Sequence, residues 1–211
     1  LSALEEQGKT VILLTDDQSV HGLFAVADTV KDSSRQAIGE LHALGIKTVM
    51  LTGDNAHTAR AIASQVGIDE ALGDLLPEDK LKAIEAKIGK GGRNSENQKV
   101  GMVGDGINDA PALARSDIGF AMGAAGTGTA IETADVALMD DDLRKLPRFV
   151  RLSRKTHALL VQNIVLALGI KAVFLILTLT GTGTMWMAVF ADVGASLLVV
   201  ANGLRLVRFR G

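Results

Sequence analysis

The chain has 211 residues, a formal net charge of −2 at pH 7 and no cysteine. A chain of this length accommodates one or two domains. Its near-neutral charge argues against a nucleic-acid-binding protein, which normally carries a basic face, so no nucleic-acid partner is expected. Without cysteine, this chain can build neither a disulfide framework nor a thiolate metal site.

The first residues resemble the end of a preceding domain rather than a fold of their own. Two β-prone runs, Lys9–Thr15 and Val20–Ala27, flank the polar segment Asp16–Ser19, and this pattern predicts a β-hairpin. Nothing before the hairpin supplies a core for it to pack on. Residues 1–27 are therefore interpreted as the tail of another domain.

Helices and strands alternate from residue 28 to residue 147. A helix capped by Asp32 or Ser33 and stopped by Gly45 is followed by a buried strand at Ile46–Leu51. The later predicted elements are a helix at Ala56–Val66, a helix from Pro77 through Ile88, a strand at Val100–Val103, a short helix at Asn108–Ala114, and strands at Ile118–Met122 and Val136–Met139. This alternation predicts an α/β fold with a doubly wound parallel sheet.

Two polar segments follow strands of this sheet, where open parallel sheets form their sites. Thr52–Asn55 comes after Leu51, and Gly104–Asp109 comes after Val103. Glycines let a phosphate approach the backbone, and the following helix amino termini favour an anion. Asp105 and Asp109 are hard oxygen donors that suit Mg²⁺, with phosphate and water completing its shell. A polar turn with a helix cap explains a lone Thr-Gly-Asp-Asn segment about equally well.

The composition changes sharply from Ala158 onward. Two apolar stretches, at about 158–179 and 185–204, are each near the ~20 residues that a helix needs to cross a bilayer. Thr180–Thr184 forms a turn between them, and neither stretch lies at the amino terminus, as a signal peptide would. Basic residues flank both ends, namely Arg148, Arg151, Arg154, Lys155, Arg205, Arg208 and Arg210. Residues 148–211 are thus predicted to form a membrane hairpin with the soluble domain and the carboxyl terminus in the cytoplasm.

Each apolar stretch contains one ionisable residue, Lys171 in the first and Asp192 in the second. At ~1.5 Å per residue, both lie roughly 11–14 Å below the outer turn, so opposite charges meet at matching depth. One interpretation is a purely structural ion pair. The other makes Asp192 an oxygen ligand for a cation in transit, with Lys171 as counter-charge once the cation has left, because intramembrane charges are usually functional.

Three segments in order carry a resemblance to a known family: Thr52–Asn55, Pro77–Lys80 and Gly104–Leu113. Together they resemble the signature of the P-type ATPase phosphorylation domain, a member of the haloacid dehalogenase superfamily. The roles that this resemblance implies are phosphoryl binding by Thr52 and Gly53, charge neutralisation by Lys80, phosphate contact by Asn108, Mg²⁺ coordination by Asp105 with support from Asp109, and contact of Asp54 with the nucleotide or the interdomain hinge.

Asn163 and Lys171, with Asp192–Gly194 in the second stretch, resemble the zinc, cadmium and lead exporters of this family. The resemblance implies a plasma-membrane pump that uses ATP and Mg²⁺ and forms an aspartyl phosphate. The family's Asp-Lys-Thr-Gly-Thr motif, which carries that aspartate, does not occur in this chain. The chain is therefore expected to be a fragment that has no ATPase activity by itself.

Three other interpretations stay open. A copper pump of the same family is the nearest, although copper-pumping relatives carry different polar residues in these two helices. A soluble haloacid dehalogenase-like phosphatase conflicts with the two apolar stretches. A non-catalytic remnant of a truncated gene is the third. The four histidines share no metal-ligand spacing, so they are not expected to form a joint metal site.

Overall fold

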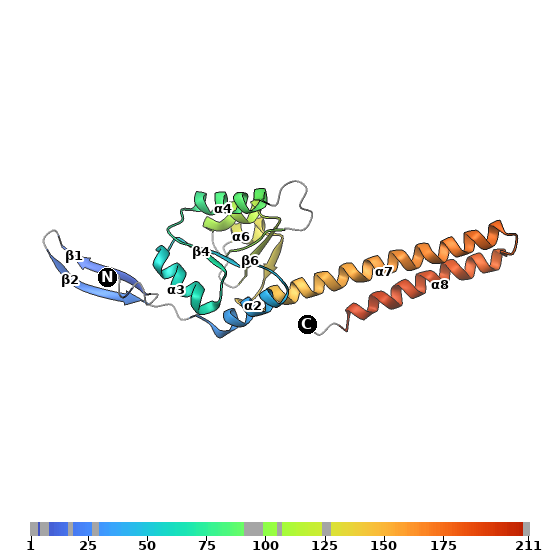
Figure 1. Cartoon of the computed structure of the whole chain (residues 1–211), viewed down its shortest axis with the longest axis horizontal. Helices are drawn as coiled ribbons and strands as arrows, with labels where there is room; N and C mark the ends of the chain where they lie inside the picture. Colours follow the sequence, from blue (N-terminus) through green and yellow to red (C-terminus); the bar gives the residue numbers. More distant parts are fainter. Residues whose placement is uncertain are drawn as a thin grey trace. The chain divides into compact units, whose positions relative to one another are not determined.

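The computed structural model describes residue 4 and residues 9–16, 19–26, 30–90, 99–104, 107–123 and 128–208. The chain divides into two compact units, Leu1–Lys145 and Leu146–Gly211. The first unit contains the strands and the shorter helices, and the second consists mainly of two long helices (Figure 1).

The predicted amino-terminal hairpin is confirmed. Strands β1 (Thr10–Thr15) and β2 (Val20–Val26) pair antiparallel. Their turn is closed at Ser19, whose backbone N–H donates to Asp16 Oδ1 at 2.6 Å. Side chains such as Phe24 are more than half exposed on this ribbon. Among the described residues, β1 and β2 pair only with each other.

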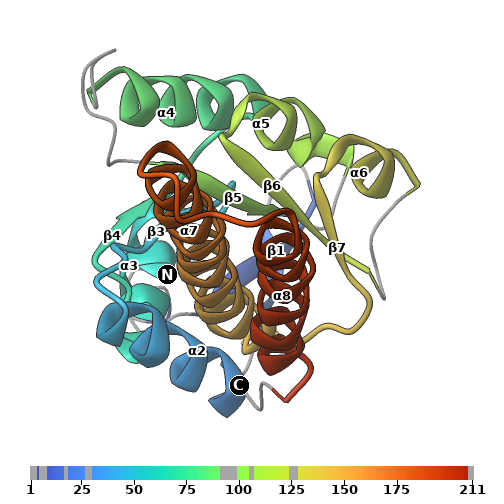
Figure 2. The same ribbon diagram turned by 90° about the vertical axis from the view of Figure 1, so that its right-hand side faces the viewer.

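The remainder of the first unit alternates helices with parallel strands, as predicted. In chain order its elements are α2 (Asp32–Ala43), β3 (Val49–Leu51), α3 (Ala56–Val66), β4 (Glu70–Leu72), α4 (Pro77–Lys90), β5 (Gly101–Gly104), a 3₁₀ turn (Ile107–Asp109), α5 (Ala110–Arg115), β6 (Ile118–Met122), α6 (Gly128–Thr133) and β7 (Val136–Leu138). β3 pairs with β4, and β5, β6 and β7 form a second sheet in that order, all parallel. Helices α4 and α6 lie on one side of these strands, and α2 and α3 lie on the other (Figures 1 and 2).

Some predicted boundaries were wrong. β3 begins at Val49 rather than Ile46, and the buried Thr48 before it binds Asp69 instead of joining a ladder. β4 was not predicted, because a three-residue strand shows no periodicity. The cap position of α2 belongs to Lys31, which makes no side-chain capping bond; Asp32 is the first helical residue, where its charge favours the helix dipole.

One hydrophobic core joins the two parallel sheets. Its buried cluster consists of Ile84, Met102, Ala112, Leu113 and Ala121. Leu51 at the end of β3 packs against this cluster, which includes Met102 of β5. The ends of β3 and β5 are therefore held close to the same packed centre.

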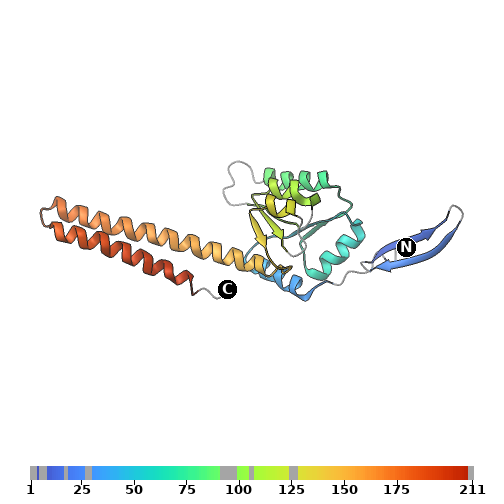
Figure 3. The ribbon, with the colours of Figure 1, turned by 180° about the vertical axis from the view of Figure 1, so that it is seen from behind.

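The second unit is a helical hairpin. Helix α7 (Lys145–Leu179) and helix α8 (Met185–Gly203) run side by side and are joined by a short turn (Figures 1 and 3). Gly181 adopts φ 76° in this turn, and the Thr184 hydroxyl caps α8 by accepting from Met187 N. A short 3₁₀ turn, Leu204–Leu206, follows α8.

Both helices are long and apolar enough to cross a membrane, with mean hydropathies of 2.2 and 1.8 in their most apolar windows. α7 starts well before the apolar stretch because backbone hydrogen bonding continues through its polar first turns. Hydropathy marks the segment that suits lipid, not the point where a helix begins.

Candidate functional site

The loop after β3 is held in a tight turn by its own side chains. Thr52 Oγ1 donates to Asp54 Oδ2 at 2.9 Å, and Asp54 N donates back to Thr52 Oγ1 at 3.1 Å. Thr52 N donates to Leu72 O of the neighbouring strand at 3.0 Å. The exposed Gly53 lies between them, so the turn presents its backbone at the carboxyl end of the sheet.

A second turn, after β4, supports this loop. Asp74 adopts φ 56°, its N–H donates to Asp54 O at 2.7 Å, and its Oδ2 accepts from Ala56 N at 3.0 Å. A Cβ on Gly73 would lie 2.7 Å from Ala56 Cα and 2.8 Å from Asp54 O. Only glycine fits there, because a side chain would meet backbone that cannot yield.

Sequence analysis missed the contribution of Gly73 and Asp74. The signal was present, because a Gly-Asp pair is a turn signature. The role of this turn depends on β4, which is too short for sequence periodicity to predict it.

Asn55 ends the loop after β3 by capping α3, with its Oδ1 accepting from Thr58 N at 2.8 Å.

Lys80 and Asp109 form a close, mostly buried ion pair. Lys80 Nζ donates to Asp109 Oδ1 at 2.9 Å, with 17% and 13% of the two side chains exposed. Lys80 lies in the first turn of α4, which begins at Pro77. Asp109 packs closely on Gly104 at the end of β5. A Cβ added to Gly104 would lie 2.7 Å from the Cβ of Asp109. Residues from two different helical segments thus meet at one strand end.

A short backbone path connects the Thr52 loop to this ion pair. Leu75 N donates to Thr52 O at 3.1 Å, and one residue later Leu76 O accepts from Lys80 N at 3.1 Å. The first turn of α4 is therefore attached to the loop after β3. For a negatively charged group bound at Thr52 and Gly53, the Lys80 ammonium on the adjoining helix would be a nearby positive charge.

The remaining predicted site residues differ in how the structure places them. Asn108 is exposed on the 3₁₀ turn, next to the buried Asp109. Asp105 lies outside the described residues, so its contact with Mg²⁺ stays a prediction. In the part of the chain that the structure describes, no three His, Cys, Asp or Glu side chains cluster as a metal site. Mg²⁺ would need oxygens from phosphate and water besides protein carboxylates, which is the shell this ion prefers.

The structure brings the two ionisable residues of the helical hairpin together. Lys171 Nζ of α7 lies 3.8 Å from Asp192 Oδ1 of α8, with 67% and 71% of the side chains exposed. Both line a shallow depression of about 270 Å³ between the helices. The other residues of this depression are Phe174, Leu175, Thr178, Ala188 and Ala191. A charged pair thus interrupts a mostly apolar surface.

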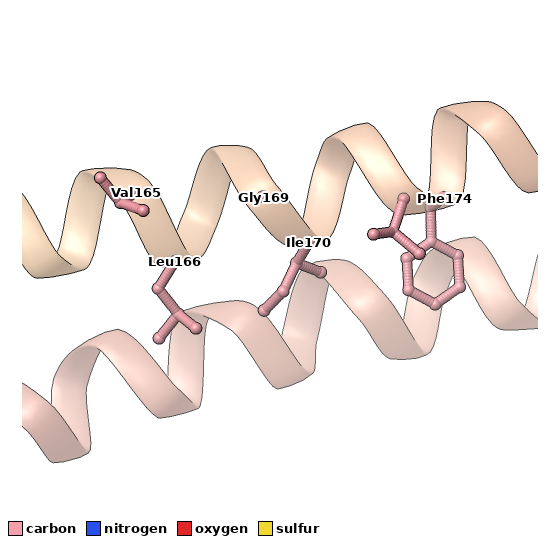
Figure 4. A pocket seen from close by; sticks show the side chains of 6 residues that line it. Val165, Leu166, Gly169, Ile170 and Phe174 are labelled. Carbon is pink, nitrogen blue, oxygen red and sulfur yellow. The ribbon is translucent and has the colours of Figure 1, made fainter.

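An apolar groove lies next to this depression. It is lined by Val165, Leu166, Gly169, Ile170, Val173 and Phe174 of α7 (Figure 4). Its volume is about 410 Å³, and its glycine carries no side chain to fill it. The residues that line this groove carry no polar side chain, in contrast to the depression that contains Lys171 and Asp192.

Comparison with known proteins places these features in one family. Residues 1–117 match the haloacid dehalogenase-like hydrolase family. A probable cadmium-transporting ATPase of Listeria monocytogenes is 54% identical over 212 residues, which cover 100% of this chain and 29% of that protein. The zinc/cadmium/lead-transporting P-type ATPase of Escherichia coli (strain K12) is 48% identical over 210 residues, which cover 100% of this chain and 28% of that protein.

A solved structure agrees with the sequence relatives. The crystal structure of a zinc-transporting PIB-type ATPase in the E2.Pi state superposes with a TM-score of 0.83 at 48% identity. The match covers 97% of this chain and 32% of that one, so the chain spans roughly a third or less of its relatives. The predicted fold class, a haloacid dehalogenase-like α/β domain followed by two long apolar helices, is confirmed. The chain belongs to the haloacid dehalogenase-like hydrolase family, and over its whole length it corresponds to a part of the heavy-metal P-type ATPases.

Proposed function

We propose that this chain is part of an ATP-driven exporter of Zn²⁺, Cd²⁺ or Pb²⁺ that works through an aspartyl phosphate. The proposal rests on one observation, namely that two features occur together in a sequence about half identical to such pumps. The first is the loop after β3, suited to phosphate, with the Lys80–Asp109 pair close by. The second is the apolar hairpin with the Lys171–Asp192 pair. A soluble phosphatase of the same fold would have no use for the hairpin. The activity belongs to the longer protein.

In the phosphorylation step, a carboxylate outside this chain attacks the γ-phosphorus of ATP, and ADP leaves. Thr52 and Gly53 would hold the transferred group at the strand end, and Asn108 would contact its oxygens. Lys80 would neutralise the charge that develops on them, since phosphoryl transfer depends mainly on positioning and electrostatics. Mg²⁺, held by Asp105 and Asp109, would supply further neutralisation when bound, and Asp54 would meet the nucleotide or the hinge.

The sheet topology indicates where the attacking carboxylate would come from. Among the described residues, β3 pairs only with β4, and β5 pairs only with β6. Yet Leu51 of β3 packs on the core that contains Met102 of β5. A parallel strand inserted between β3 and β5 would complete one sheet. Its carboxyl end would lie between the Thr52 loop and Asp109, which is where a phosphorylated aspartate is needed.

In the membrane part, Asp192 would be an oxygen ligand for the transported cation. It is the only carboxylate in the sequence after Asp142, so no neighbour in the hairpin can replace it. Lys171 would compensate its charge once the cation has left. The basic residues at both ends of the hairpin support a plasma-membrane protein whose phosphorylation domain and carboxyl terminus are cytoplasmic.

The test uses the full-length gene product, purified in detergent or lipid. Hydrolysis of Mg-ATP is measured with Zn²⁺, Cd²⁺, Pb²⁺ or Cu⁺ added separately, and the phosphoenzyme is trapped in acid and checked for cleavage by hydroxylamine. Stimulation by the divalent metals and a hydroxylamine-sensitive phosphoenzyme are expected. Stimulation by Cu⁺ alone would support the copper pump instead. Hydrolysis that no metal changes, or a gene without an in-frame Asp-Lys-Thr-Gly-Thr upstream, would reject the proposal.

A further inference from the structure

A second polar contact joins the two helices of the hairpin, far from the lysine–aspartate pair. Asn202 Nδ2 of α8 donates to Asn163 Oδ1 of α7 at 2.8 Å, and both residues are partly buried. Asn202 Oδ1 accepts from Arg205 Nη1, one turn further along the chain, at 2.9 Å. Gln162 Oε1 lies 3.5 Å from Asn202 Nδ2, at the limit of a hydrogen bond.

Arg205 determines which way the Asn202 amide faces. A guanidinium has only donors, so the group next to Arg205 must be the amide oxygen. The Nδ2 group is then directed at Asn163, which can only accept through its Oδ1. The three residues form a directional relay in which a charged donor fixes the interhelical bond.

The relay and the Lys171–Asp192 ion pair lie at different levels of the hairpin, and the two helices connect them. Asn163 precedes Lys171 by eight residues, and Asn202 follows Asp192 by ten, which correspond to about 12 and 15 Å along the helices. The groove residues between Asn163 and Lys171 are apolar, and Leu166, Ile170 and Phe174 reach from α7 toward α8 (Figure 4). Apolar surfaces alone fix a register weakly in lipid, because acyl chains are as apolar as leucine.

The register decides whether Asp192 can face Lys171. A slip of one residue moves α8 by about 1.5 Å and turns its side chains by about 100°. The existing Nζ–Oδ1 distance of 3.8 Å is already at the edge of an ion pair. A slip would therefore move Asp192 out of reach of Lys171 and change the geometry offered to a cation.

We propose that Asn202, oriented by Arg205, is a positioning residue that holds α8 in register against Asn163 and so keeps Asp192 opposite Lys171. The inference rests on the proposed function, since its consequence is the geometry of the cargo site. Asn202 binds no metal in this scheme. It acts on transport only through the place that it gives to Asp192.

The test measures zinc-stimulated ATP hydrolysis of the full-length protein with wild type and Asn202→Ala. An interhelical hydrogen bond in lipid contributes about 0.6–1.7 kcal/mol, so the half-saturating zinc concentration should rise about 3- to 16-fold. The maximal rate and the half-saturating ATP concentration should stay close to wild type. Thr156→Ala is the control, because Thr156 Oγ1 donates to Leu152 O of the same helix at 2.9 Å.

Two further comparisons test the contact from its other residues, and the Arg205 variants keep Asn202 in place in case Asn202→Ala inserts poorly. Arg205→Ala should raise the half-saturating zinc concentration less than Asn202→Ala does, and Arg205→Lys should restore it, because lysine can also donate to the amide oxygen. Asn163→Ala combined with Asn202→Ala should be no worse than either alone. Unchanged zinc dependence in all the Asn202 and Arg205 variants, or additive effects of the two asparagines, would overturn the positioning role while leaving the proposed function intact. A wild-type protein that no divalent metal stimulates would instead reject the proposed function.

Discussion

The chain contains two lysine–aspartate pairs in opposite surroundings. Lys80 and Asp109 lie 2.9 Å apart with 17% and 13% of their side chains exposed, enclosed by α4, the 3₁₀ turn and the end of β5. Lys171 and Asp192 lie 3.8 Å apart with 67% and 71% exposed, on the surface of two helices. The same two side chains thus form an enclosed pair in one unit and an open pair in the other.

The difference shows how far each site is complete within this chain. The first pair is mostly covered by the chain's own elements, and removing one partner would leave a mostly buried charge without its partner, which costs up to about 3–5 kcal/mol. The second pair would contribute about 0–1 kcal/mol in water, but charges at the same depth in lipid are unfavourable unless other groups cover them. In a bilayer the open pair would therefore need other helices to cover it, and under the proposed function a transported cation would enter beside it.

The largest expected effect follows replacement of the open carboxylate. In the full-length protein, Asp192→Ala should reduce zinc-stimulated hydrolysis to the unstimulated level, with the protein still inserted in the membrane. The reason is that no other carboxylate lies in either helix of the hairpin. Zinc binding and zinc-dependent hydrolysis are measured together. Normal transport by this variant would show that the pair is structural and that Asp192 is no ligand.

Lys171→Ala should differ in kind from Asp192→Ala. The variant keeps a carboxylate that can hold a metal, so zinc binding should survive. Turnover should change, because no counter-charge replaces the cation after release. The matched measurement is equilibrium zinc binding beside the rate of hydrolysis without zinc. Loss of zinc binding equal to that of Asp192→Ala would mean that Lys171 serves the site only by holding Asp192.

The enclosed pair should respond in the rate of chemistry rather than in binding. Lys80→Ala should slow phosphoenzyme formation about 10²- to 10³-fold, as expected when one preorganised group is removed from a developing charge. ATP affinity should fall much less. Rapid-quench measurement of phosphoenzyme formation at saturating ATP gives the rate, and nucleotide binding is the control. A variant that loses affinity but keeps its maximal rate would assign Lys80 to nucleotide binding.

Sequence patterns predicted candidate site residues, but they did not predict all of the residues that support them. The Thr52 loop and Asp109 were predicted because small residues and acids follow strand ends, whereas Lys80 was predicted only from the resemblance to the P-type ATPase signature, and the roles of all three stay predictions. Gly73 and Asp74 were missed because their role depends on β4, three residues that reveal no period. Which residues support a loop is decided by tertiary contacts between segments, and a local pattern does not contain them.

In the helical hairpin, the sequence predicts how far along the helix axis each residue lies but not which side chains meet. Equal depth below the turn predicted that Lys171 and Asp192 are neighbours, because two antiparallel helices share one axis coordinate. The same count places Asn163 and Asn202 at nearly equal depth, 17 residues before Thr180 and 18 residues after Thr184. Depth alone does not predict their hydrogen bond, because the contact also depends on which faces of the two helices meet and on side-chain reach.

A smaller effect is expected from the turn that supports the phosphate loop. Gly73→Ala should destabilise the protein by about 1–3 kcal/mol, the usual effect of overpacking, because its Cβ would meet the backbone of Ala56 and Asp54. Gly39→Ala is the control, since Gly39 lies inside α2 with open space around its Cβ position. That change should stabilise by about 0.5–1 kcal/mol. Thermal unfolding of the full-length protein compares the two, and equal midpoints would contradict the close packing at Gly73.

The smallest expected effect concerns a carboxylate away from both pairs. Asp69 Oδ2 accepts from Thr48 N at 2.7 Å and from Thr48 Oγ1 at 2.9 Å, with His42 Nε2 at 3.0 Å. The backbone N–H of Thr48, followed by its hydroxyl, lowers the pKa of Asp69 below its ordinary value of 3.8. A carboxyl group with a lowered pKa stabilises the folded state above that ordinary value, and the contribution disappears as pH falls through the folded-state pKa.

Asp69→Asn should therefore change the pH dependence of stability more than stability itself. The wild type should be more stable than this variant near neutral pH. The difference should shrink as pH falls below about 4, because the Asp69 carboxyl of the unfolded chain binds a proton first and that of the folded protein does so only at its lower pKa. Unfolding midpoints measured from pH 7 to pH 3 give this difference. Glu132→Gln, at an exposed position of α6, removes a charge without removing these hydrogen bonds and should show no such trend. A difference for Asp69→Asn that stays constant down to pH 3 would mean that Thr48 holds the amide as well as the carboxylate, so that the link between β3 and the turn before β4 depends on shape rather than charge.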